Sequence, residues 1–439
     1  MFKLLQIILT TILVSFYFFP FEFTFLPGIN TKMMLAVVGL ILLVFVLIKK
    51  QDFTMPRFLL VLFVIASIIS LMALLSITYN QTEDTSYVTY IISAAVWLSS
   101  AFTVCFFIKL VHGSISLQLL FEYLLAVCVF QCAATMLIEF VPDVRFFVDT
   151  YVSQNQEYLQ KEGRLYGIGA SLDMAGSRFS IVLAVLPAII FRNKESPDVG
   201  KLINYFFSFI VITVVGNMIS RTTTVGAAIG LIYLFLMLII PSFKLSYGKS
   251  RIFWTVCMVL AVLIPTVVVL YRVFPAFQNL IRFGFEGFFS LAEKGEWDVG
   301  SNKTLQSMVV FPETMKTWLI GDGYFLNSRY DVNYLGDATT MGFYMGTDIG
   351  YLRFLFYFGV FGLLAMVTMI VYSAKACMEL LPEYKAVFLL ILAVGLIVWL
   401  KVSTDVFLAY ALVICLGLMK QKEEEGNEAS EELALLSEE

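Results

Sequence analysis

Long apolar runs alternate with short polar segments along almost the whole chain of 439 residues. About twelve of these runs approach the roughly 20 residues that a helix needs to cross about 30 Å of hydrocarbon. Hydrophobic residues make up 60% of the chain and the mean hydropathy is +0.87, whereas soluble domains are about 45–50% apolar. We therefore expect an all-α, polytopic transmembrane protein, with helices near residues 4–26, 33–48, 57–78, 88–110, 115–141, 172–191, 202–219, 222–241, 252–273, 347–374, 384–400 and 402–419.

Basic residues are unevenly distributed among the polar segments. The connections on one side are short and basic, as at Lys49, Lys50, Arg192 and Lys422. The positive-inside rule makes this side cytoplasmic and places both termini there. The first apolar run has no small-residue cleavage site, which predicts a retained helix rather than a removed signal peptide.

Two long loops lie on the opposite side, at residues 142–171 and 274–346, the second between the ninth and tenth predicted helices. Loops of this length are often functional. Within the second, residues 283–291 mix aromatic and polar side chains, which suits either the lipid interface or packing inside the loop. We predict one transmembrane domain, 1–422, that includes both loops, and an acidic, disordered cytoplasmic tail, 423–439.

Several classes of function find no support in the sequence. The net charge of −4 gives no argument for a nucleic-acid partner. The six cysteines fall in or just beyond apolar runs, without metal spacing or a disulfide pattern. The one histidine, His112, lies on an inner connection, and no serine-hydrolase triad, zinc site or Walker motif can be assembled. We expect neither a metal nor a cofactor.

Charged residues gather where the apolar runs meet the outer side. Arg221 stands between two runs, at a membrane boundary where a cation is costly and therefore often functional. An arginine fork matches phosphate oxygens, so several arginines around one outward-open cavity would bind a pyrophosphate. The alternative is that each arginine reaches lipid headgroups or pairs with a nearby aspartate. The other members of this set are Asp173, Arg178, Asp348, Arg353, Lys401 and Asp405, with pairs Arg178–Asp173 and Arg353–Asp348 in the alternative interpretation.

A general base on the outer side would have to be a carboxylate, because that side has no histidine. The candidates are Asp348, Asp173, Asp405 and Asp322.

Glycines mark two further stretches. Residues 318–325 predict a tight turn around Gly321 and Gly323. Residues 346–353 predict the capped start of a helix, and Gly359 and Gly362 within it predict close helix packing.

The order of these motifs resembles the Wzy-type polysaccharide polymerases of the O-antigen ligase and polymerase superfamily. The resemblance covers about residues 164–405. It is carried by Ser220-Arg221-Thr222, then Gly321-Asp322-Gly323-Tyr324 in the large loop, then Asp348-x-Gly350-Tyr351-x-Arg353 leading into Gly359-x-x-Gly362.

The resemblance implies a GT-C-type glycosyltransferase of the bacterial inner membrane whose active site faces the periplasm. It would join undecaprenyl-pyrophosphate-linked oligosaccharide repeats, with membrane lipids and a chain-length regulator protein as further partners. Arg221 and Arg353 would engage pyrophosphates, joined by Arg178, with Asp348 beside them in the catalytic set. The remaining expected substrate-binding residues are Arg164, Asp173, Lys303, Asp322, Tyr324, Tyr351 and Lys401.

The chain departs from the family pattern in two places. Many relatives carry an arginine where this chain has Ser301-Asn302-Lys303-Thr304, so Lys303 would replace it with a less directional charge. O-antigen ligases typically have a histidine in the large loop, and its absence favours a polymerase. A flippase or transporter for lipid-linked oligosaccharide and an O-antigen ligase are the alternatives.

Overall fold

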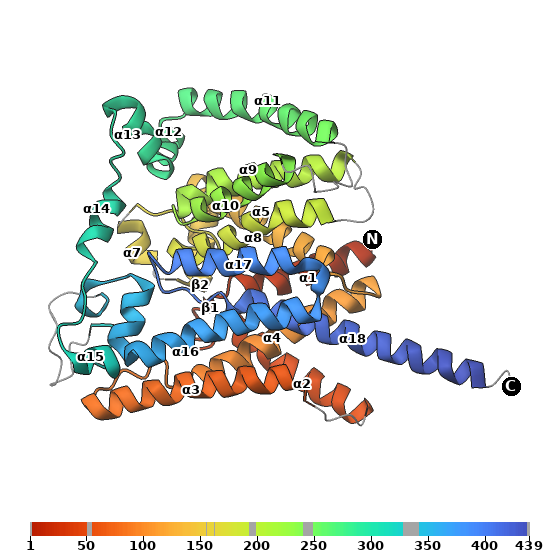
Figure 1. The fold of residues 1–439 in the computed structure, drawn as a ribbon. Helices are drawn as coiled ribbons and strands as arrows, with labels where there is room; N and C mark the ends of the chain where they lie inside the picture. Colours follow the sequence, from red (N-terminus) through yellow and green to blue (C-terminus); the bar gives the residue numbers. More distant parts are fainter. Residues whose placement is uncertain are drawn as a thin grey trace.

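The computed structural model describes residues 2–50, 55–154, 156–161, 163–192, 199–239, 249–327 and 342–436 (Figure 1). A helix lies in each apolar segment predicted from the sequence. These helices are α1 (Phe2–Phe18), α2 (Thr31–Lys50), α3 (Arg57–Asn80), α4 (Tyr90–His112), α5 (Leu117–Phe140), α8 (Leu172–Arg192), α9 (Val199–Ile219), α10 (Thr223–Ile239), α11 (Lys249–Val273), α16 (Gly350–Leu380), α17 (Lys385–Val398) and α18 (Phe407–Leu436).

The two long loops contain short elements. The first loop holds α6 (Pro142–Tyr151), β2 (Val152–Ser153) and α7 (Gln156–Lys161), and β2 pairs antiparallel with β1 (Glu22–Phe23). The second holds α12 (Pro275–Gly284), α13 (Glu286–Lys294), α14 (Gly300–Ser307), α15 (Met315–Leu319) and the 3₁₀ turn η1 (Tyr344–Gly346), and η2 (Pro382–Tyr384) precedes α17. In Figure 1 α7 of the first loop and α13, α14 and α15 of the second lie at one end of the bundle, and α18 projects from the other end.

The predicted class, a polytopic helical membrane protein, is confirmed. Within the described residues, seven helices are long and apolar enough to cross a membrane. An eighth crossing results if α11 and α12, which meet at a 119° bend, form one broken span. Twelve crossings therefore stay a prediction.

Three segment boundaries differ from expectation. Helix α1 ends at Phe18, two residues before Pro20, because a residue that precedes proline disfavours the helical conformation. Helix α18 begins at Phe407 rather than near 402, which leaves Lys401 and Asp405 in an irregular turn. It then continues to Leu436 through the tail predicted to be disordered, since Glu, Ala and Leu favour helices.

Helix α8 forms the centre of the bundle and packs against α10, α17, α9 and α5. Glycines on α10 allow the closest of these approaches. A methyl group at Gly226 would lie 2.1 Å from the Cα of Ser180, and one at Gly230 would lie 2.5 Å from the carbonyl oxygen of Leu183. Close backbone contact of this kind, through small residues, is how membrane helices gain packing energy in lipid.

Helix α16 is interrupted at Phe358 and Gly359, and the large loop attaches at this break. The amides of Asp322 and Gly323 donate to the carbonyl oxygens of Phe356 and Tyr357 at 2.6 and 3.1 Å. Gly321 and Gly323 both have positive φ, as the predicted tight turn requires. The predicted close packing at Gly359 is also confirmed, because a methyl group there would lie 2.3 Å from the Leu319 carbonyl oxygen.

The predicted capping at the start of α16 is wrong. Helix α16 begins at Gly350 with Ile349 in the cap position, and no side chain caps it. Asp348 does not bond the first free amides, because its carboxylate faces Arg353 one turn into the helix.

Candidate functional site

A cavity of about 410 Å³ opens at the end of the bundle where the two long loops lie. Helices α8, α10 and α16 begin beside it, and α9 and α17 end there. Its walls carry three cations, Arg164, Arg221 and Lys401, and three carboxylates. The full lining is Arg164, Leu172, Asp173, Ile219, Ser220, Arg221, Glu286, Gly300, Ser301, Thr304, Leu305, Met308, Asp348 and Lys401.

Arg221 projects into this cavity from the turn between α9 and α10. Its Nη1 lies 2.7 Å from a carboxylate oxygen of Glu286 and donates to Ser301 Oγ at 3.1 Å. Its Nε donates to the Phe283 carbonyl oxygen at 3.1 Å, and its guanidinium lies 4.4 Å from the centre of the Phe283 ring. Arg164 reaches the same ring at 4.8 Å. Two guanidinium groups from different loops therefore meet over one aromatic side chain.

Arg221 has no acidic neighbour in the sequence, but it is paired in the structure. Glu286, the first residue of α13, supplies the missing carboxylate from a distant part of the chain. Burial lowers the pKa of the Arg221 guanidinium, and Glu286 opposes this by stabilising the charge. The arginine still keeps its proton at any physiological pH.

Asp173 holds the turn that carries Arg221. Its Oδ1 accepts from Lys401 Nζ at 2.7 Å and from Ser220 Oγ at 2.8 Å, and Thr222 Oγ1 is also bonded to it. Lys401 additionally donates to Thr222 at 3.0 Å. The suggested pairing of Asp173 with Arg178 is therefore wrong, because Lys401 and the two hydroxyls flanking Arg221 donate to that carboxylate.

Arg353 lies behind Asp348 rather than on the cavity wall. Its Nη1 is 3.4 Å from Asp348 Oδ1 and donates to Ser403 Oγ at 2.7 Å. Its guanidinium sits 3.5 and 3.8 Å from the ring centres of Phe325 and Phe343, and only 6% of its side chain is exposed. The predicted pairing with Asp348 is confirmed, and the predicted exposure to a shared cavity is wrong for Arg353.

Burial raises the pKa of the Asp348 carboxyl to about 7, although Arg353 acts in the opposite direction. Asp348 therefore changes charge near neutral pH while lining the cavity. A carboxylate with such a pKa suits proton transfer, since an effective general base titrates near the working pH.

Arg178 is also absent from the lining of this cavity. It is 3% exposed and lies with its guanidinium 5.6 Å from the centre of the Phe19 ring. Asp405, in the turn before α18, is likewise absent from the cavity lining and accepts from the Phe407 amide at 2.8 Å. Position along α8 places Arg178 one to two turns below Asp173, and the neighbouring helices close over it.

Four other predicted substrate-binding residues have partners elsewhere. Lys303 points to Asp298 at 2.8 Å on the exposed side of α14. Asp322 accepts from Lys316 at 2.5 Å, the buried Tyr324 stacks on Tyr344, and the Tyr351 hydroxyl donates to the Leu396 carbonyl oxygen. The cavity thus unites Arg164, Asp173, Arg221, Asp348 and Lys401.

The sequence interpretation missed Glu286, Ser301 and Thr304, which all line the cavity. The only signal for Glu286 was a lone carboxylate in an aromatic stretch, which is too common to be specific. Comparison with protein-family models, with curated proteins and with solved structures found no match.

Proposed function

We propose that the chain is a glycosyltransferase that polymerises oligosaccharide repeats carried on undecaprenyl pyrophosphate. The observation that carries this proposal is the convergence of Arg164, Arg221 and Lys401 on one cavity at the loop-bearing end of the bundle. We further propose that this end faces the periplasm from the bacterial inner membrane, as the basic connections at the other end favour. The product would be O-antigen or a related surface polysaccharide.

The charges of the cavity suit a diphosphate that enters from outside. Three cations face three carboxylates, Asp173, Glu286 and Asp348. Glu286 is the carboxylate most easily displaced, because 38% of its side chain is exposed. A diphosphate that replaced Glu286 at Arg221 would keep the charge-assisted hydrogen bonds and add a second bidentate partner at Arg164. Ser301 and Thr304 offer hydroxyls to the same ligand.

In the proposed reaction, Asp348 accepts the proton of an acceptor sugar hydroxyl. The hydroxyl oxygen then forms a bond to the anomeric carbon of the donor chain, and the bond between that carbon and the pyrophosphate oxygen breaks. Arg164, Arg221 and Lys401 stabilise the charge on the departing pyrophosphate. Arg353 acts through Asp348 as a positioning residue, since it touches the carboxylate and not the cavity.

A strain that lacks the protein tests this proposal. Its surface glycan is expected to lose all long chains and to keep single repeats, because flipping and ligation do not need the polymerase. A loss of single repeats as well would indicate the flippase or the ligase, and an unchanged profile would exclude all three functions.

The rate of chain elongation is expected to follow the titration of Asp348. As a general base, Asp348 acts when deprotonated, so the rate should fall about tenfold per pH unit below about 7 and level off above it. Asp348→Asn should lower the plateau by about 10²–10⁴ and abolish this dependence. The measurement is elongation of lipid-linked repeats by purified protein between pH 5 and 9.

Asp298→Asn is the matched control. Asp298 is a carboxylate of the large loop that does not line the cavity. Its ion pair with Lys303 lowers its pKa. This variant should keep the wild-type pH profile. If Asp348→Asn lowers the rate but the rate still falls below about pH 7, Asp348 only holds Arg353 in place and is not the general base.

A further inference from the structure

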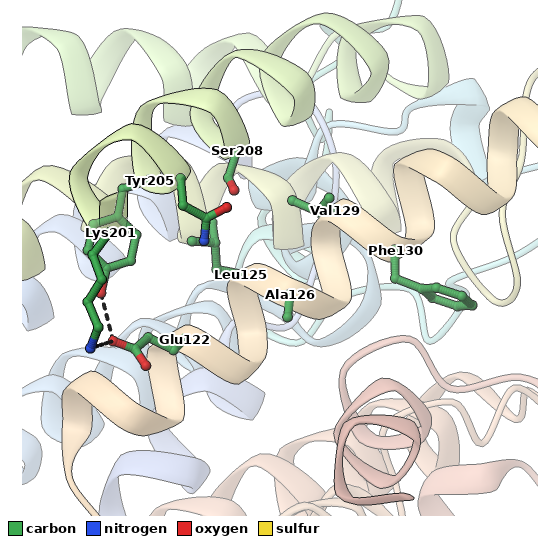
Figure 2. Close-up of a pocket in the computed structure, with 9 residues that line it drawn as sticks. Glu122, Leu125, Ala126, Val129, Phe130, Lys201, Tyr205 and Ser208 are labelled. Carbon is green, nitrogen blue, oxygen red and sulfur yellow. Dashed lines mark hydrogen bonds and ion pairs between the residues drawn. The ribbon is translucent and has the colours of Figure 1, made fainter. Parts of the chain in front are cut away.

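A second cavity, of about 450 Å³, lies between α5 and α9 at the opposite end of the bundle (Figure 2). It begins near the N-terminal ends of both helices, at Glu122 and Lys201, whereas the first cavity includes the C-terminal end of α9. Positive-inside topology puts it in the cytoplasmic leaflet. Nothing in the proposed glycosyl transfer uses it.

Two helix faces form its walls. On α9 the lining residues recur at the i, i+3, i+4 and i+7 spacing of a single face, as Lys201, Asn204, Tyr205 and Ser208. On α5 they follow the same spacing from Glu122 through Leu125 and Ala126 to Val129. Figure 2 shows Lys201 and Tyr205 on one helix beside Glu122 on its neighbour, with Phe130 farther along α5.

The charged end of the cavity is built around Glu122. The Tyr205 hydroxyl donates to Glu122 Oε1 at 2.7 Å, and the Gln118 amide donates to the same oxygen at 3.2 Å. Lys201 Nζ lies 3.6 Å from this oxygen, with 57% of its side chain exposed. A carboxylate that accepts two hydrogen bonds and a largely exposed ammonium therefore lie side by side near the N-terminal ends of α5 and α9.

Polarity decreases in order along the cavity. The ionic pair at residues 122 and 201 is followed by the amide of Asn204 and then by the hydroxyl of Ser208. The α5 wall is apolar from the first turn after Glu122, with Ala126 and Val129 at the levels of Tyr205 and Ser208 and the half-exposed Phe130 one residue farther. Seven residues of helix span about 10 Å, which is longer than the roughly 5–8 Å thickness of one headgroup region and so reaches into the acyl chains.

We propose that this cavity binds a zwitterionic phospholipid with a primary ammonium headgroup, a phosphatidylethanolamine. Glu122 accepts hydrogen bonds from the ammonium, Lys201 faces the phosphate, Asn204 and Ser208 lie beside the glycerol esters, and an acyl chain follows Val129 and Phe130. An anionic phospholipid offers the phosphate without a partner for Glu122. A lipid pyrophosphate fits less well, since its several negative charges would face one lysine and a carboxylate.

Native mass spectrometry of the purified full-length protein tests this assignment. With equimolar palmitoyl-oleoyl phosphatidylethanolamine and phosphatidylglycerol, the wild type should retain the ethanolamine lipid about tenfold more. Glu122→Gln should bring this ratio close to one, because the neutral amide no longer favours the ammonium. Lys201→Gln should weaken retention of both lipids and keep the ratio.

The matched controls are Lys375→Gln and Glu379→Gln. These residues form an ion pair at 3.7 Å near the C-terminal end of α16, with side chains 61% and 63% exposed. Neither variant should change the ratio. Phosphatidylcholine gives a test without mutation, because its trimethylated headgroup cannot donate to Glu122 and should be retained less than phosphatidylethanolamine. Equal retention of these lipids by the wild type, or equal effects of Glu122→Gln and Glu379→Gln, would overturn the assignment.

Discussion

Arg221→Ala is expected to leave cells with single repeats and no long polysaccharide chains. The substitution removes the guanidinium that contacts Glu286 and Ser301 in the cavity and Phe283 beside it. Loss of one preorganised donor to a departing charge typically costs about 10²–10³ in rate, and the chain grows by many such steps. The glycan profile of a deletion strain that carries the variant measures the effect. Arg221→Lys should restore only part of the chain length, since an ammonium cannot bind a phosphate bidentately.

Arg282→Ala is the matched control for Arg221→Ala. Arg282 belongs to α12 in the large loop, next to the Phe283 that Arg221 contacts, pairs with Glu293 at 2.7 Å and lies 4.9 Å from the centre of the Phe289 ring. It thus repeats the contacts of Arg221 with a carboxylate and a phenylalanine, outside the cavity. Normal chain length is expected from Arg282→Ala. Long chains from Arg221→Ala, at wild-type protein levels, would refute the assigned role.

Gly359→Ala is expected to prevent stable folding. Gly359 has φ +71° and ψ −173°, a region almost confined to glycine, which costs another residue about 1–3 kcal/mol. Its new methyl group would lie 2.3 Å from the carbonyl oxygen of Leu319, and such overpacking adds about 1–3 kcal/mol. The sum, about 2–6 kcal/mol, reaches the lower end of the roughly 5–15 kcal/mol by which folded domains are typically stable. The measurements are the yield of monodisperse protein in detergent and its thermal denaturation midpoint.

Gly346→Ala separates the two causes of this loss. Gly346 also has a positive φ, +65°, but a methyl group there meets nothing within 4 Å. Only the backbone strain of about 1–2 kcal/mol should appear, with a small drop in the denaturation midpoint. Equal behaviour of the two variants would show that the contact between α16 and the segment after α15 contributes little to stability.

The helical elements could be predicted because crossing a membrane requires long apolar runs, which are visible in any sequence. The turn at Gly321 and Gly323 could also be predicted from the sequence, since few residues other than glycine adopt positive φ. Five of the eleven expected site residues line one cavity because they flank the ends of helices that meet there.

The predicted site residues that do not line the cavity were misplaced because the sequence does not show how each helix is rotated about its axis or how deeply it is buried. Arg178 and Arg353 lie only one to two turns from their helix starts, but the sequence does not tell which way those faces point. Both faces turned out to be covered, Arg353 by Phe325 and Phe343. Glu286 illustrates the converse, because a loop residue far along the chain supplied the partner that Arg221 lacked locally.

The measurement that tests the central claim most directly is elongation by the purified protein alone. Lipid-linked repeats in detergent have no membrane to cross, so only a transferase can change them. The wild type should convert single repeats into a ladder of longer products with release of undecaprenyl pyrophosphate, and Arg221→Ala should not. Single repeats left unchanged by the wild type, or a full ladder made by Arg221→Ala, would contradict the account.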